Sequence, residues 1–161
     1  MPGRRVLGIA AASGRVGFVL MFRGKPCQWG LSRTAAKTAN EAARIAKDWI
    51  IRFRPDVVVT EEITGKCRKG KRAKANIAAI ASLAADAELY DVSVPRPHRF
   101  RNKYAEAEAL AERFPEMRPR LPKKRPLWDS EPRNTTIFEA LALALEVVDR
   151  EPSSEPEASS A

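Results

Sequence analysis

The chain has 161 residues and carries 29 Lys and Arg against 20 Asp and Glu, which gives a formal net charge of +9 at pH 7. This length allows one domain with a real hydrophobic core and leaves little for a second. The basic excess favours a polyanionic partner, nucleic acid above all, and no apolar run of about eighteen residues is present that could cross a membrane.

The first half of the chain predicts three strands, a helix and a fourth strand. Short turns join the first three strands into an antiparallel meander, which we expect at residues 5–9, 18–22 and 27–32. Thr38 and Glu41 have the spacing of a capping box, and the helix that they begin ends at Pro55. A strand over 57–61 follows, and this strand–helix–strand order favours parallel pairing.

The second half predicts two helices, a strand between them and a last helix. We expect these at 72–87 (helix), 89–94 (strand), 102–113 (helix) and from Asn134 or Thr135 to Val148 (helix). The five prolines between 114 and 132 predict an irregular surface loop there. The fold class is therefore α/β, with three antiparallel and two parallel strands in one mixed five-stranded sheet and helices on both faces.

The end of the chain differs in composition from the rest. Residues 151–161 are rich in Glu, Ser and Pro and have almost nothing to bury, so we expect a disordered acidic tail after a domain over 1–150. Cys27, Cys67 and the single His98 form neither a zinc ligand pattern nor a disulfide framework, which fits a cytoplasmic protein.

The strand over 57–61 ends in two carboxylates, Glu61 and Glu62, and the chain then turns basic. Acids at the carboxyl end of a buried strand, next to cations, suggest metal-assisted work on nucleic acid. We expect nucleic-acid contact from the cations of this run and of a later loop: Lys66, Arg68, Lys69, Lys71, Arg72, Lys74, Arg99, Arg101 and Lys103. Phe100 and Tyr104 either stack on bases or anchor the core.

Three motifs in this order resemble the RuvC-type Holliday junction resolvases, which have a ribonuclease H-like fold. They are Leu7-Gly8-Ile9-Ala10 in the first strand, Val57-Val58-Val59-Thr60-Glu61 in the fourth, and Thr136-Ile137-Phe138-Glu139-Ala140-Leu141-Ala142 in the last helix. The resemblance implies that Glu61 and Glu139 are catalytic metal ligands for Mg²⁺ or Mn²⁺. It also implies nucleic acid as partner, with branched DNA favoured over RNA and the choice between them left open, and a possible homodimer.

Two departures from this family pattern weaken the implied metal site. Ala10 stands where the family has its first-strand aspartate, and Thr136 replaces the first acid of the last helix. Two cations at close range need more negative charge than Glu61 and Glu139 provide, so we expect metal-dependent cleavage to be lost or weakened. Thr136 and Glu139 could instead form a capping box.

Two alternative functions remain open. The chain could be an active Mg²⁺- or Mn²⁺-dependent endonuclease that recruits a replacement ligand, for which Glu62, Asp91 and Asp129 are candidates. It could also be a non-enzymatic assembly protein whose basic surface binds an acidic protein.

Overall fold

The structure is a computed structural model, and it describes residues 4–64, 69–87, 89–96, 100, 102–122 and 134–150. The predicted tail over 151–161 lies outside the described residues, as does 123–133 within the predicted loop. None of the described helices is long and apolar enough to cross a membrane.

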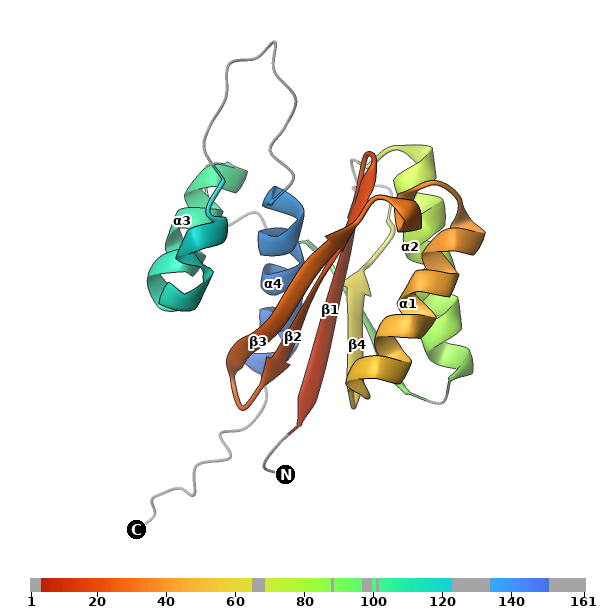
Figure 1. The fold of residues 1–161 in the computed structure, drawn as a ribbon, viewed down its shortest axis with the longest axis horizontal. Coiled ribbons are helices and arrows are strands. Elements are labelled where there is room, and N and C mark those ends of the chain that lie inside the picture. Colours follow the sequence, from red (N-terminus) through yellow and green to blue (C-terminus); the bar gives the residue numbers. More distant parts are fainter. Residues whose placement is uncertain are drawn as a thin grey trace.

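Within the described residues, five strands form one mixed sheet in the order β3-β2-β1-β4-β5 (Figure 1). The strands are β1 (Arg5–Ala12), β2 (Arg15–Phe22), β3 (Lys25–Ser32), β4 (Val57–Glu61) and β5 (Tyr90–Val94). The pairs β1–β2 and β2–β3 are antiparallel, whereas β1–β4 and β4–β5 are parallel. The predicted fold class is thereby confirmed, and each predicted strand is present, with β1 and β2 extended toward each other by about three residues.

The helices cover both faces of this sheet. They are α1 (Ala39–Phe53), α2 (Lys71–Asp86), α3 (Lys103–Arg113) and α4 (Thr135–Val148), with short 3-10 turns η1 (Thr34–Ala36) and η2 (Pro115–Arg120). Figure 1 shows α1 and α2 side by side on one face, with α4 and α3 on the other. The η2 turn corrects the prediction of an irregular loop: Phe114 and the fully buried Met117 pack into the core beside α3 and α4, and this packing orders the segment.

Local signals explain where these elements begin and end. The Thr38 hydroxyl accepts a hydrogen bond from the Glu41 backbone N–H at 3.0 Å and caps α1. Arg54 ends the same helix in the left-handed region, at φ 47°, directly before Pro55. Arg23 and Gly24 both have positive φ values, as a tight two-residue hairpin between β2 and β3 requires.

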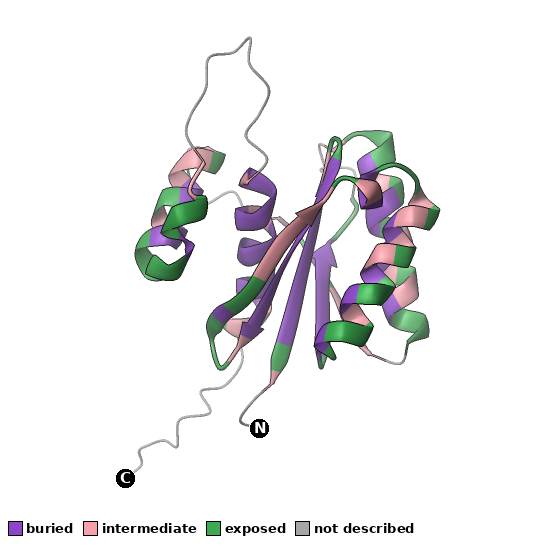
Figure 2. Cartoon of the chain, viewed as in Figure 1, coloured by how far each residue is buried: buried purple, intermediate pink, exposed green. Residues whose placement is uncertain are grey.

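The central strands β1 and β4 are buried on both faces (Figure 2). Leu7 and Val58 point to the α1 and α2 face, whereas Val6, Val57 and Val59 point to α4. A continuous apolar run such as Val57–Val59 is what a strand enclosed by helices on both faces needs. The alternation along these two strands decides which of their later side chains meet α4.

Candidate carboxylate site and nucleic-acid surface

Glu61 and Glu139 lie on the same side of the sheet. Glu61 ends β4 and follows Val57 and Val59 in alternation, so its side chain faces α4, and it is 7% exposed. Glu139 projects from the second turn of α4. The structure thus brings together the two carboxylates that the sequence singled out, near the carboxyl ends of β1 and β4.

A lysine ammonium lies between these two carboxylates. The Lys69 Nζ atom forms an ion pair with Glu139 Oε2 and lies 3.9 Å from Glu61 Oε1. It also donates a hydrogen bond to the Ala11 backbone oxygen at 2.6 Å. We call Glu61, Glu139 and Lys69 the carboxylate site. Lys69 was expected to contact nucleic acid, but its charged atom points into the protein.

Arg96 closes one side of the carboxylate site. Its guanidinium donates two hydrogen bonds to the Glu106 carboxylate, at 3.0 and 2.6 Å, and its Nε lies 3.6 Å from Glu139 Oε2. Burial opposes the charge of Arg96, but its hydrogen bonding to Glu106 and the charges of Glu139, Glu106 and Glu61 outweigh it and raise the Arg96 pKa. The arginine is therefore held in place from α3 while it neutralises charge on α4.

Arg15 connects β2 to the start of α4. Its Nε donates to the Thr136 hydroxyl at 2.7 Å, and its Nη2 lies 3.3 Å from the Thr135 hydroxyl. Burial lowers the pKa of Arg15, and the charge of Glu139 offsets part of this effect. Because Thr136 accepts from Arg15 and Glu139 pairs with Lys69, the capping box that their spacing suggested is not formed, and Asn134 takes the N-cap position.

Ala10 stands where the resembled family has its first-strand aspartate. Gly8 pairs with Val59 across the parallel β1–β4 ladder, and Ala10 and Glu61 each follow two residues farther on, on the same face of the sheet. Ala10 is 1% exposed and packs into the α4 side of the core. An acid at position 10 would therefore point toward the carboxylate site, where the chain now offers a methyl group.

The residues at this site do not fit a two-metal centre. No cluster of three or more His, Cys, Asp or Glu side chains able to hold a metal ion occurs among the described residues. Ala10 supplies no oxygen, and the Thr136 hydroxyl accepts from a guanidinium. The space between Glu61 and Glu139 already receives the Lys69 ammonium. A divalent ion there would meet a positive charge at close range.

The replacement ligands considered from the sequence are distributed differently. Asp91 lies on β5 and pairs with Val58 of β4, on the face that α1 and α2 cover. Burial raises the pKa of Asp91. Glu62 follows Glu61 at an exposed position after β4. Asp129 lies outside the described residues. Neither described candidate shares the α4 face with Glu61 in the strand alternation.

The expected nucleic-acid contacts fall into three groups. Lys71 and Arg72 are exposed in the first turn of α2, Lys74 is half-buried one turn on, and Lys103 begins α3. Burial lowers the pKa of Lys103, and the nearby cations Arg15, Lys69 and Arg96 lower it further against the pull of Glu139. Four expected contacts lie outside the described residues: Lys66, Arg68, Arg99 and Arg101.

The aromatic residues near these cations differ in exposure. Phe100 is 42% exposed, and Tyr104 in α3 is half-buried. An exposed ring is available for stacking on a base, so of the two roles considered for Phe100, stacking is compatible with its position.

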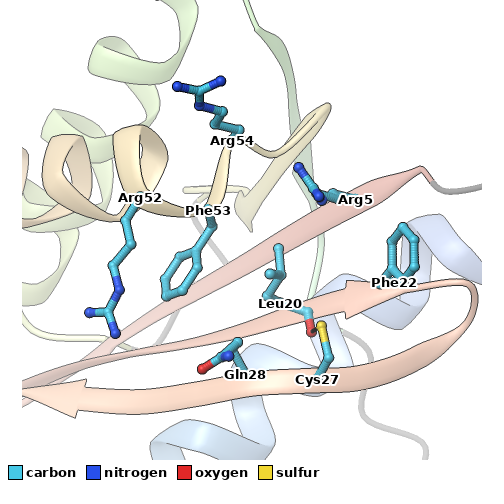
Figure 3. A pocket seen from close by; sticks show the side chains of 8 residues that line it. All are labelled: Arg5, Leu20, Phe22, Cys27, Gln28, Arg52, Phe53 and Arg54. Atoms are coloured by element: carbon cyan, nitrogen blue, oxygen red, sulfur yellow. Dashed lines mark hydrogen bonds between the residues drawn. The ribbon is translucent and has the colours of Figure 1, made fainter.

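A concave surface lies at the amino end of β1, away from the carboxylate site (Figure 3). It is formed by the side chains of Arg5, Leu20, Phe22, Cys27, Gln28, Arg52, Phe53 and Arg54. Figure 3 shows Cys27 and Gln28 on β3 and Leu20 and Phe22 on the neighbouring β2, with Arg52, Phe53 and Arg54 at the end of α1. The Cys27 thiol donates to the Leu20 carbonyl at 3.4 Å, and burial raises its pKa, so it is not an activated nucleophile.

Sequence reasoning missed the partners that neutralise the carboxylate site. Arg96 and Glu106 lie in a loop and a polar helix, where nothing in the local pattern marks them as buried. Arg15 and Thr136 are 121 residues apart in the chain and meet only through the sheet. A possible signal was the run of cations that follows Glu61, since a buried carboxylate requires a counter-charge.

Comparison with known proteins identifies the fold. No protein-family model and no curated protein sequence matches this chain. Among solved structures, RuvC from Thermus thermophilus superposes with a TM-score of 0.59 and 16% sequence identity, covering 88% of this chain and 91% of that one. The fowlpox virus resolvase in complex with Holliday junction DNA gives a TM-score of 0.57 and 17% identity, over 91% and 99% of the two chains.

A third similar structure comes from a eukaryotic organelle. The yeast mitochondrial Holliday junction resolvase Ydc2 superposes with a TM-score of 0.53 and 14% identity, over 89% of this chain and 78% of that one. At these identities the likeness concerns the arrangement of the backbone. The chain therefore has the ribonuclease H-like fold of the RuvC-type Holliday junction resolvases.

Proposed function

We propose that this protein binds branched or structured DNA and that its metal-dependent nuclease activity is lost or strongly weakened. The observation that carries the proposal is the Lys69 ammonium between Glu61 and Glu139, on the face of the sheet that carries Ala10. In this fold the same position is expected to hold the metal ions. The surface around it keeps the positive charge that a phosphate backbone needs.

The binding half of the proposal rests on the start of α2. Lys71 and Arg72 are exposed there, directly after the loop that carries Lys69. Cations in the first turn oppose the helix dipole and so do not stabilise the helix, whereas a phosphate group would relieve the repulsion. Their placement therefore favours a role in binding over a role in folding.

Charge reversal at these two positions separates binding from stability. The Lys71→Glu, Arg72→Glu double variant should bind a four-way junction at least about tenfold more weakly, with a smaller salt dependence, because phosphate contacts are lost. Its free energy of unfolding should hold or rise by roughly 0.5 kcal/mol, since acids suit a helix N-terminus. Gel-shift titrations at several salt concentrations and urea denaturation measure the two effects.

A matched control carries the same change in charge elsewhere. Lys37 and Lys47 are both exposed, before and within α1, so the Lys37→Glu, Lys47→Glu variant should keep most of its junction affinity. If both double variants bind equally well, the start of α2 is not the DNA surface. Lys69 is left intact in these variants because its reversal would place a third negative charge beside Glu61 and Glu139.

The same titrations distinguish the alternative functions. Weak junction binding whose affinity does not change with salt concentration, together with binding to an acidic protein, would favour the assembly role. Preference for the junction over duplex and single-stranded DNA of the same sequence supports the proposal. The homodimer and the cytoplasmic location expected from the sequence stay predictions, and sedimentation of the full chain with and without a junction tests the former.

A further inference from the structure

We propose that the Lys69 ammonium is a tethered substitute for a divalent cation, and that removing it opens a divalent-cation site at Glu61 and Glu139. The inference rests on the proposed loss of metal-dependent cleavage, but it does not depend on DNA binding. In this inference the Lys69 ammonium balances the negative charge of Glu61 and Glu139 in place of a bound ion.

The first argument is the set of atoms around the ammonium. Lys69 Nζ contacts a carboxylate oxygen of Glu139, lies 3.9 Å from one of Glu61, and donates to the Ala11 carbonyl oxygen at 2.6 Å. Carboxylate and carbonyl oxygens are also the atoms that hard divalent cations prefer. These three oxygens come from β4, α4 and β1, so the ammonium joins the same three elements that an ion at this place would join.

The second argument is charge. The side chains of Glu61, Glu139 and Lys69 are 7%, 13% and 17% exposed, so both carboxylates lie largely out of water where they approach the ammonium. Such a pair needs positive charge nearby to remain ionised. With Ala10 in place of an acid, Lys69 and Arg96 lie against these carboxylates, and Arg15 and Lys103 add positive charge near Glu139, so a pair of divalent ions would exceed the negative charge present.

The third argument is that Arg96 alone does not neutralise both carboxylates. Both of its terminal nitrogens are engaged by Glu106, and only its Nε approaches Glu139, at 3.6 Å. Lys69 approaches both carboxylates of the site. Loss of the lysine therefore removes a positive charge that lies within 4 Å of both carboxylates, and a small divalent cation can take its place.

Manganese binding to three forms of the full chain, without DNA, tests this inference. The forms are the unaltered protein, Lys69→Met, and the control Lys71→Met, which removes an exposed lysine two residues farther on. Free Mn²⁺ is followed by electron paramagnetic resonance, and the midpoint of thermal unfolding is recorded with and without the ion. We expect Lys69→Met to bind one Mn²⁺ at least about tenfold more tightly than the other two forms, because the positive charge that occupies this place is gone.

Further variants keep the test decisive. Mn²⁺ should raise the unfolding midpoint of Lys69→Met and leave the other two forms unchanged, and adding Glu139→Gln to Lys69→Met should abolish the gain. If Lys69→Met does not fold, Lys69→Gln retains an N–H donor for the Ala11 carbonyl and is measured instead. Mn²⁺ binding by the unaltered protein as tight as by the lysine variants would overturn the inference, as would weak binding by every folded Lys69 variant.

Discussion

At the scale of single residues, the stability of the protein depends on which of its ion pairs are buried. The pairs Lys69–Glu139 and Arg96–Glu106 lie in the interior next to α4, whereas Arg113 and Asp149 form a comparable bidentate pair at the surface. Breaking a buried pair leaves one charge without compensation, but breaking an exposed pair returns both groups to water. The two kinds of pair should therefore differ widely in their effect on stability.

Arg96→Gln tests the buried pair. This variant should lower the free energy of unfolding by about 3 kcal/mol or more, because Glu106 loses both of its hydrogen bonds while remaining buried. Arg113→Gln removes a guanidinium with the same two-bond geometry from α3, the helix that carries Glu106, and should cost less than about 1 kcal/mol. Urea denaturation of both variants measures the difference. Equal losses would show that burial does not govern these pairs.

Asp91 offers a test of the opposite kind. Its Oδ1 is buried with no hydrogen-bond partner among the described residues, and burial raises its pKa. An acid with a raised pKa in the folded state is destabilising above that pKa, and the penalty disappears below its ordinary value of 3.8. Asp91→Asn should therefore stabilise the protein at pH 7 and leave stability nearly unchanged at about pH 3.

Thermal or urea unfolding of the unaltered and Asp91→Asn proteins across this pH range measures the effect. A gain that persists undiminished at acid pH would mean that the carboxylate charge is not its cause. A loss of stability at pH 7 would mean that the Asp91 carboxylate has a favourable partner.

At the scale of elements, the contact between β1 and α4 determines how the site is assembled. Helix α4 is buried over nearly its whole length from Thr135 to Leu145, and it crosses the sheet directly over Gly8. A Cβ atom at Gly8 would meet the Ala140 carbonyl oxygen and come within 2.9 Å of the Ala144 Cβ. Glycine at this position therefore lets the helix approach closely enough for Glu139 to reach the end of β4.

Gly8→Ala should accordingly destabilise the protein by about 3 kcal/mol, because the obstacle is backbone and cannot rotate away. Gly70→Ala is the matched control, since nothing lies within 4 Å of a Cβ there and its φ is negative. It should cost no more than about 1 kcal/mol, the effect of a poorer helix cap. Chemical denaturation compares the two, and a tolerated Gly8→Ala would contradict the close packing of α4 on β1.

At the scale of the whole molecule, the order of elements follows from local patterns. The apolar run Val57–Val59, the cap at Thr38 and the stop at Pro55 predict their elements because each acts over a few neighbouring residues. The alternation along β4 also places Glu61 on the α4 side. These signals are enough for the topology of the sheet.

The contacts inside the carboxylate site cannot be predicted from such local patterns. The Lys69–Glu139 pair and the Arg15–Thr136 contact join segments from opposite parts of the chain, and they form only once the sheet is complete. The capping box suggested by Thr136 and Glu139 was wrong for the same reason: tertiary partners outcompete the local motif. The η2 turn was missed because its order comes from the packing of Met117 rather than from its prolines.

The most direct test of the account is the fate of a labelled four-way junction held in complex with the protein. Junction and excess protein are incubated with Mg²⁺ or Mn²⁺, complex formation is verified on a native gel, and strand integrity is read on a denaturing gel. We expect the junction to be bound and to remain uncut. Robust nicking that disappears in the Glu61→Gln variant would contradict the account.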